Sequence, residues 1–254
     1  MKKTLSLIAV IASMGVASAA SIAGLDSSYT KDSTTYNGTT GDTVTISTTT
    51  NPLNLYTGNN WTAAFTISDM AVTTGSNVGI LYTYNTSKPY YNIEGIGYQL
   101  TGEGALTLCV GGFNYNGGTA ASSPWKTQSI TGWTSGTALN IFYEYNNGNV
   151  NIYVMLGNDE STYTQLASLS SGAAFSGEKL TQFNMSAKSG SGNTWTAPNG
   201  VTGAYTLENM DIYNQLLTAD QKKEYALSAN PVPEPTTAAL GLIGLSLLAL
   251  RRRV

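Results

Sequence analysis

Leu139-Asn-Ile-Phe-Tyr-Glu-Tyr-Asn-Asn-Gly-Asn-Val-Asn-Ile-Tyr-Val-Met-Leu156 contains two runs in which apolar and polar residues alternate. Residues two apart on a strand share a face. One face therefore carries Leu139, Ile141, Tyr143 and Tyr145, followed by Val150, Ile152, Val154 and Leu156. Asn146-Asn-Gly-Asn149 joins the runs, and Asn-Gly readily adopts the positive φ angles of a tight hairpin turn. The pattern predicts a β-hairpin with one buried face.

Short runs of the same kind continue on both sides, separated by Gly, Asn and Ser clusters. The candidate strands are Thr43–Thr48, Trp61–Ile67, Val78–Tyr84, Gly97–Leu100, Ala105–Val110, Leu139–Tyr145, Val150–Leu156, Tyr163–Ala167, Leu180–Ser186 and Tyr205–Tyr213. One segment differs: Thr218-Ala-Asp-Gln221 has the pattern of a capping box. It predicts a helix from about Ala219 to Ser228, with Tyr225 and Ala226 packed inward. The body is thus all-β with one short C-terminal helix.

Two segments resemble laminin-G-like, concanavalin A-like domains. Glu208-Asn-Met-Asp-Ile-Tyr-Asn-Gln-Leu-Leu-Thr-Ala-Asp-Gln221 is similar to their closing strand and helix start, and Asn60-Trp-Thr-Ala-Ala-Phe-Thr-Ile67 to an early strand. The resemblance implies a jelly-roll sandwich of two antiparallel sheets across residues 21–230. A different β-sandwich and a β-solenoid are the alternatives, although no fixed repeat period supports a solenoid.

Residues 1–20 are typical of a secretory signal peptide. Lys2 and Lys3 form the charged start, Leu5 to Val16 the apolar middle, and Ala17-Ser-Ala19 the small-residue cleavage site, with Ala17 and Ala19 at the recognised positions. A buried N-terminal helix is the alternative, which the lysine pair and the Ala-Ser-Ala ending disfavour. We therefore expect export by the secretion machinery.

Residues 231–254 combine Pro231-Val-Pro-Glu-Pro235, an apolar run from Thr236 to Leu250, and three arginines. As a helix the apolar run would span about 22 Å, less than the roughly 30 Å of a hydrocarbon core, so length favours a temporary stay in the membrane. The arginines favour a cytoplasmic C-terminus. An ordinary transmembrane anchor is the alternative.

This tail resembles the PEP-CTERM sorting signal of Gram-negative bacteria. The resemblance is carried by Val232 with Pro233, Glu234 and Pro235, by the apolar stretch, and by the cluster Arg251, Arg252 and Arg253. It implies that an exosortase cleaves near the Pro-Glu-Pro motif. The body would then be released to the cell surface or an extracellular polysaccharide matrix.

Composition excludes several functions. The chain has no histidine, which removes Ser-His-Asp and Cys-His catalysis and the usual zinc sites. Cys109 is the only cysteine, so no intramolecular disulfide forms, and its strand context predicts a buried apolar role. All three arginines lie in the C-terminal tail, and the body is acidic. We therefore expect no binding to nucleic acid.

Catalysis is not expected either. Glycoside hydrolases with this fold place alternating carboxylates on one strand, and the chain has no Glu-x-Asp-x-Glu run. Glu208 and Asp211 are three apart, which puts them on opposite faces of a regular strand, and Asp159-Glu160 falls in a predicted turn. A divergent hydrolase remains the weakest of three hypotheses.

Carbohydrate binding fits the sequence better. Trp125, Trp133 and Trp195 lie in polar, glycine-rich stretches, where an exposed aromatic face could stack on a sugar. The alternative for each is a place in the core. No cofactor is expected, although the oxygens of Asn158, Asp159 and Glu160 could hold calcium. The hypotheses are a carbohydrate-binding or adhesive module, a structural matrix protein, and a hydrolase.

Overall fold

The structure is a computed structural model of the chain. It describes residues 20–27, 29–37, 41–45, 60–71, 77–84, 93–100, 105–116, 119–121, 126–146, 149–170, 182–186, 189–190 and 204–230. The predicted signal peptide and sorting segment, except for Ala20, lie outside these residues.

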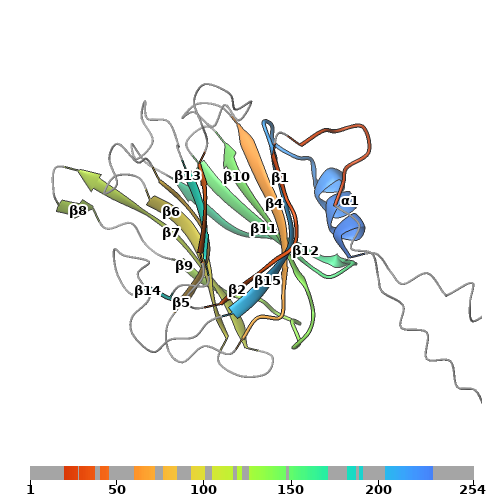
Figure 1. The fold of residues 1–254 in the computed structure, drawn as a ribbon, viewed down its shortest axis with the longest axis horizontal. Coiled ribbons are helices and arrows are strands. Elements are labelled where there is room, and N and C mark those ends of the chain that lie inside the picture. Colours follow the sequence, from red (N-terminus) through yellow and green to blue (C-terminus); the bar gives the residue numbers. More distant parts are fainter. Residues whose placement is uncertain are drawn as a thin grey trace, which may run out of the picture.

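Among the described residues, two antiparallel sheets face each other, and one helix packs against the outer face of one of them (Figure 1). The sheet beside the helix, here the helix-side sheet, has seven strands: β1 (Tyr29–Lys31), β2 (Thr34–Asn37), β4 (Trp61–Ser68), β10 (Leu139–Asn146), β11 (Asn149–Leu156), β12 (Asp159–Ser170) and β15 (Ala204–Tyr213). The far sheet has eight: β3 (Gly41–Thr45), β5 (Asn77–Tyr84), β6 (Ile93–Leu100), β7 (Leu106–Asn116), β8 (Thr119–Ala121), β9 (Lys126–Ser129), β13 (Gln182–Ser186) and β14 (Ser189–Gly190).

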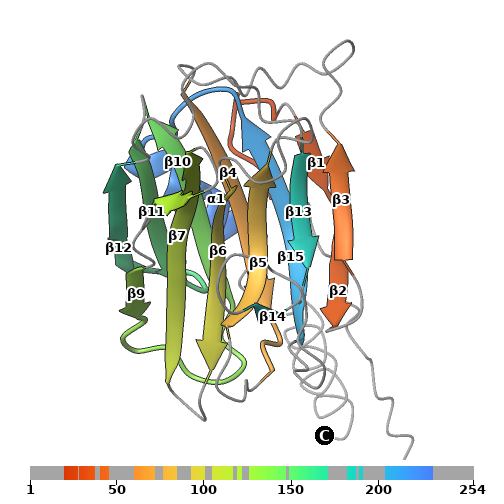
Figure 2. The same cartoon turned by 90° about the vertical axis from the view of Figure 1, so that its left-hand side faces the viewer.

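Strand order confirms the predicted sandwich. The helix-side sheet runs β1-β15-β4-β10-β11-β12, so the last strand of the chain lies between two early ones. The far sheet, which faces the viewer in Figure 2, runs β3-β13-β5-β6-β7-β8. Such non-consecutive neighbours are expected when antiparallel strands alternate between two sheets, as they do in a jelly roll.

The observed pairing register confirms the predicted hairpin. Strand β10 pairs with β11 from Leu139 opposite Leu156 to Asn146 opposite Asn149. This pairing leaves a two-residue connection, as the Asn-Gly pair predicts. The predicted inward residues of both strands belong to the buried core.

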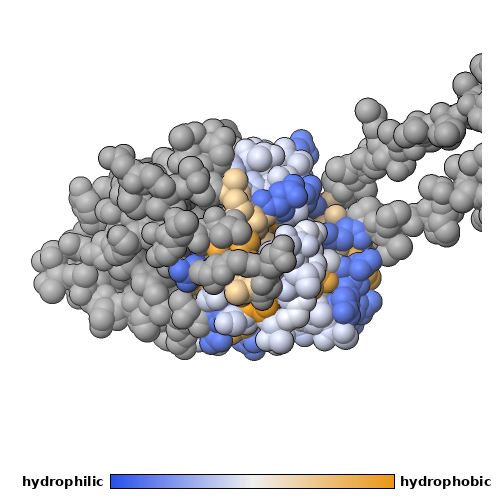
Figure 3. All heavy atoms as spheres, turned by 90° about the horizontal axis from the view of Figure 1, so that it is seen from below, coloured by the Kyte–Doolittle hydropathy of each residue, from blue (hydrophilic) through white to orange (hydrophobic). Residues whose placement is uncertain are grey.

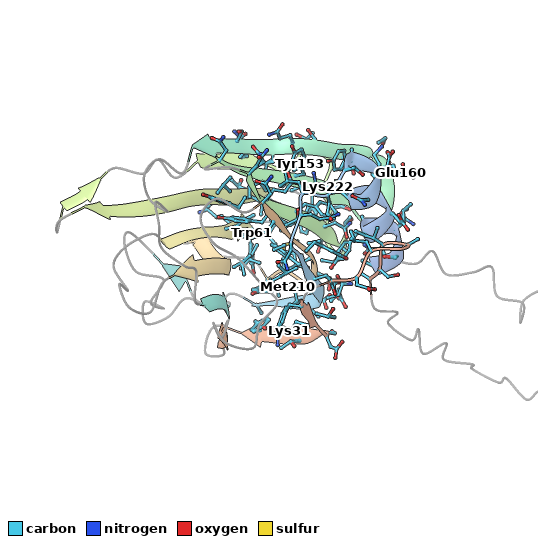
Figure 4. All side chains as sticks on the ribbon, turned by 90° about the horizontal axis from the view of Figure 1, so that it is seen from above. Lys31, Trp61, Tyr153, Glu160, Met210 and Lys222 are labelled. Atoms are coloured by element: carbon cyan, nitrogen blue, oxygen red, sulfur yellow. The ribbon has the colours of Figure 1, made fainter. Side chains whose placement is uncertain are left out.

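Aromatic side chains fill much of the space between the sheets. Trp61 is 2% exposed and stacks on Tyr143, with 5.6 Å between ring centroids, which confirms its predicted core position. Trp61 and Met210 lie on the inner side of the helix-side sheet (Figure 4). Cys109 is also buried, and burial raises the pKa of its thiol to about 11, which keeps it protonated and unreactive.

The prediction of a single buried face is wrong for the centre of the helix-side sheet. Both faces of β4 and β10 are buried along nearly their whole length. The reason is the helix α1 (Ala219–Ala229), which covers the outer face of this sheet. The alternating sequence pattern therefore identified the more polar side of these strands, but a helix covers that side instead of water.

Helix α1 confirms its sequence prediction. Thr218 Oγ1 accepts a hydrogen bond from Gln221 N at 3.2 Å, and Thr218 N donates to Gln221 Oε1 at 2.9 Å, which completes the capping box. Tyr225 and Ala226 are fully buried against the sheet. Among the residues that the structure describes, no helix has the length and apolarity needed to cross a membrane.

Strand ends differ from the predictions. β12 begins at Asp159, although Asp159-Glu160 was predicted to be a turn, and β7 extends to Asn116. The short strands β1, β2, β8, β9 and β14 were not predicted. Two to four residues give too few alternating positions for a periodicity to be recognised.

Candidate functional site: the helix pole

Helix α1 seals a polar layer on the outer face of the helix-side sheet. The buried polar and charged side chains of the described residues are Thr62, Thr66, Asn140, Glu144, Asn209, Asp211 and Lys222. All but Lys222 come from β4, β10 and β15. Buried polar groups are costly unless they find partners, so their contacts decide what this face can do.

The strongest contact is an ion pair between the helix and the sheet. Lys222 Nζ lies 2.7 Å from Glu144 Oε1, and both side chains are only 4% exposed. Burial raises the pKa of Glu144, and the ammonium of Lys222 opposes that rise. Lys222 Nζ also lies 3.8 Å from the centroid of the Tyr153 ring, which is a cation–π contact (Figure 4).

The contacts continue outward as a lysine–tyrosine cluster. Tyr153 stacks on Tyr163 with 5.8 Å between centroids and 3° between the ring planes. Lys223 Nζ lies 5.7 Å from the centroid of Tyr163 and 3.6 Å from Glu160 Oε2. Tyr153 and Tyr163 therefore contact each other, and each of them also contacts one lysine. The cluster therefore attaches α1 to β11 and β12, and the tyrosine faces already have protein partners.

A second polar group lies under the helix. The Tyr225 hydroxyl is 2.8 Å from Ala64 O and 2.7 Å from Asn209 Oδ1. Asp211 is 2% exposed, and its Oδ1 accepts from Thr30 Oγ1 at 2.5 Å. Within the described part of the chain, no hydrogen-bond donor reaches Asp211 Oδ2. Burial raises the pKa of Asp211, although the hydrogen bond from Thr30 opposes the rise.

We expect Asp211 to make the fold less stable as pH rises. A carboxyl whose pKa is higher in the folded state binds more protons there, so stability falls from about pH 4 upward, by about 1.4 kcal/mol for each tenfold difference between the two dissociation constants. Asp211→Asn should weaken this pH dependence in urea titrations at a series of pH values from 4 to 7. Asp26→Asn, at an exposed position, removes one carboxylate in the same way and controls for the change in net charge. Identical pH dependence in Asp211→Asn and the parent would contradict this account.

An N-terminal segment, Ala20–Leu25, lies against the same helix. Ser21 N donates to Ser228 Oγ at 2.9 Å, and Ser228 Oγ donates to Ser21 O at 3.0 Å. Ala23 N donates to Glu224 Oε1 at 2.7 Å. Ala20 and Ile22 are buried in the small core under the helix. The start of the described chain is therefore held beside the end of α1.

The end of the described chain is held as well. Asn230 Nδ2 donates to Asn140 Oδ1 at 2.9 Å and to Ala226 O at 2.9 Å. Asn140 is itself fixed, because its Nδ2 donates to Met155 O and Gly157 O. We call the N-terminal segment together with Ala226–Asn230 the helix pole. Both boundaries of the body meet there.

Trp133, one of three proposed sugar contacts, lies in the core. Its side chain is 3% exposed, and its Nε1 donates to Thr137 O at 2.9 Å. The glycines on either side, Gly132 and Gly136, have φ angles of +81° and +86°, which glycine adopts most easily. These glycines are explained by the turn that they form and not by a ligand site. The glycine-rich context was therefore misleading, and we no longer consider Trp133 a sugar contact.

Trp125 and Trp195 lie outside the described residues, as do Ala17, Ala19, Pro233, Glu234, Pro235, Arg251, Arg252 and Arg253. In the sequence, Trp125 immediately precedes β9, and Trp195 follows β14 by five residues. Both strands belong to the far sheet, on the side away from α1.

The carboxylates have separate partners. Glu208 accepts from Ser68 Oγ, whereas Asp211 accepts from Thr30 Oγ1. A bulge between Leu207 and Asn209 breaks the regular alternation assumed for this pair. Asp159 Oδ1 accepts from Ser161 N at 3.0 Å and from its hydroxyl at 2.6 Å. Among the described residues, no three acidic or cysteine side chains are grouped as metal ligands.

Sequence reasoning missed the buried ion pair that attaches α1 to the sheet. Glu144 occupies the polar side of the hairpin and Lys222 starts a lysine pair on the helix, both of which are ordinary surface patterns. A signal was available: a helix predicted directly after the last strand must cover one sheet face. Any charge on that face then needs an opposite charge on the helix.

Solved structures with a similar fold are β-sandwich binding domains. The binding domain of botulinum neurotoxin DC in complex with rat synaptotagmin II has a TM-score of 0.51 at 8% identity, covering 81% of this chain and 46% of that one. The same domain in complex with SialylT gives 0.50 at 10% identity, covering 81% and 46%. A botulinum neurotoxin type C structure gives 0.50 at 9% identity, covering 78% and 43%. The chain thus spans less than half of these structures, and the likeness shows the fold.

The tail is defined by its sequence. Residues 231–253 match the model of the PEP-CTERM protein-sorting motif, which confirms the predicted sorting signal. The motif marks an exported, exosortase-processed protein. The comparison with curated proteins found no match to this chain.

Proposed function

We propose that this chain is a surface or extracellular-matrix protein of a Gram-negative bacterium, and that its β-sandwich binds carbohydrate after removal of a signal peptide and the sorting tail. The sorting motif at 231–253 supports export and processing. An exported sandwich with a low charge and many Ser, Thr, Asn and Tyr side chains suits a polysaccharide environment.

The observation that carries the binding proposal is the contrast between the two sheets. The outer face of the helix-side sheet is covered by α1, and its tyrosines and carboxylates already have protein partners. Trp125 and Trp195 instead flank strands of the far sheet. We therefore assign carbohydrate contacts to the far sheet and its loops, with stacking on these two indoles.

The fold relatives suggest which glycans to test. One is described as a complex with SialylT. Another is described by a dependence of cell entry on two ganglioside molecules. Sialylated glycans and bacterial matrix polysaccharides are therefore the first probes for this chain.

The processed protein should bind a defined subset of a glycan array. Trp125→Ala or Trp195→Ala should weaken that binding about tenfold, since about 1.4 kcal/mol of lost stacking is a factor of ten. Trp133→Phe is the matched control, because this indole is buried and should not contact ligand. Unchanged binding in both alanine variants would remove the two contacts, and an empty array would favour a structural matrix role.

Hydrolysis is tested with the same protein. Reducing-sugar release from matrix polysaccharides should stay at the level of a no-protein sample. Release above that level would replace the binding proposal with the hydrolase hypothesis.

A further inference from the structure

We propose that the helix pole is the surface that this protein turns toward the membrane while its sorting tail is still attached. The proposal rests on the proposed export, because it concerns the precursor held at the outer surface of the inner membrane. In this proposal the tethered domain has a defined orientation, and the membrane surface is the partner of the helix pole.

Both chain boundaries meet at the helix pole. Ser228 Oγ bridges the backbone of Ser21, at 2.9 Å from its N and 3.0 Å from its O. Asn230, two residues beyond Ser228, is fixed to Asn140 on β10. The predicted signal peptide, residues 1–20, and the sorting tail, residues 231–254, therefore adjoin the body at one place.

The tail is short before its apolar run begins. Six residue steps separate Asn230 from Thr236, which reach about 20 Å when fully extended. A domain of this size is about 40 Å across. With Asn230 held on the sheet, the tail is too short to pass around the body. The domain cannot place its opposite end against the membrane without releasing Asn230.

The chemistry of the helix pole also suits a membrane surface. The last turn of α1 carries no basic residue, and the nearby Glu224 carboxylate accepts a hydrogen bond from Ala23 N. Ser21, Ala23 and Gly24 are exposed and small, and Leu227 is 38% exposed. Figure 3 shows mainly hydrophilic and neutral residues on the right-hand end of the described surface, where α1 lies in Figure 1. Such a surface can lie against headgroups without burying an unpaired charge.

The test measures accessibility in the full-length protein. Ala23→Cys places a thiol on the helix pole, and Ser129→Cys places one on exposed β9 of the far sheet. Native Cys109 is buried, with its pKa raised to about 11, so it should not react. A maleimide–polyethylene glycol reagent is added to spheroplasts of cells that lack exosortase. We expect Ala23→Cys to be labelled several-fold more slowly than Ser129→Cys.

Two controls isolate the tether. A flexible Gly/Ser linker of about sixteen residues after Asn230 adds an average reach of about 20–24 Å and should bring the two labelling rates together. The released, processed proteins should also be labelled equally. Equal rates in the tethered precursor without the linker would overturn the orientation. Labelling of both sites only after lysis would overturn export as well. Loss of glycan binding alone would leave the orientation standing.

Discussion

Replacing Lys222 with methionine should destabilise the protein by about 3–5 kcal/mol, because it leaves a buried carboxylate without its counter-charge. Glu144 is held 2.7 Å from the ammonium in a site where each side chain is only 4% exposed. The variant also loses the cation contact on Tyr153. Urea denaturation followed by tryptophan fluorescence measures the loss.

The adjacent lysine is the matched control. Lys223 pairs with Glu160 at 3.6 Å, and their side chains are 30% and 53% exposed. Solvent screens such a pair, so Lys223→Met should cost less than about 1 kcal/mol. Equal losses from the two substitutions would contradict the buried ion pair.

Two further results would identify the cause. Adding Glu144→Met to Lys222→Met should recover most of the lost stability, because an apolar pair replaces both charges. The destabilisation of Lys222→Met alone should also shrink at acid pH. Burial already raises the pKa of Glu144, and without Lys222 that pKa should rise further, so lowering the pH neutralises the stranded carboxylate.

Trp133→Ala should destabilise the fold by about 3–5 kcal/mol, the usual cost of deleting a buried tryptophan. The side chain is 3% exposed within the core between the sheets, and it also donates to Thr137 O. Thermal and urea unfolding of the purified variant measure the loss.

Trp133→Phe separates packing from hydrogen bonding. It keeps an aromatic ring but removes the donor to Thr137 O, and should cost about 1–2 kcal/mol. If Trp133→Ala instead lowered glycan binding and left stability unchanged, Trp133 would be a surface contact and its core placement would be wrong.

The sandwich was predictable because its signals are local. Alternation from Leu139 to Leu156 and the Asn-Gly turn determine a hairpin without reference to the rest of the chain, and its observed register agrees. Thr218 and Gln221 lie three residues apart, so the capping box was equally visible. The sorting signal is also a contiguous segment.

The helix pole was not predictable in the same way. Its partners are far apart in sequence: Ser21 meets Ser228, and Asn140 meets Asn230. Nothing in either local sequence specifies the other. Trp133 shows the converse error, since Gly132 and Gly136 gave it the local context of an exposed loop although long-range packing buries it. Contacts between residues that are far apart in sequence can be identified only when the fold is known.

We propose that this chain is exported, trimmed at both ends, and displayed outside as a β-sandwich. Intact mass spectrometry of the protein recovered separately from cells and from medium tests it most directly. We predict an extracellular species that begins near Ala20 and ends near Pro233-Glu234-Pro235. Full-length, untrimmed protein found only inside the cells would contradict the account.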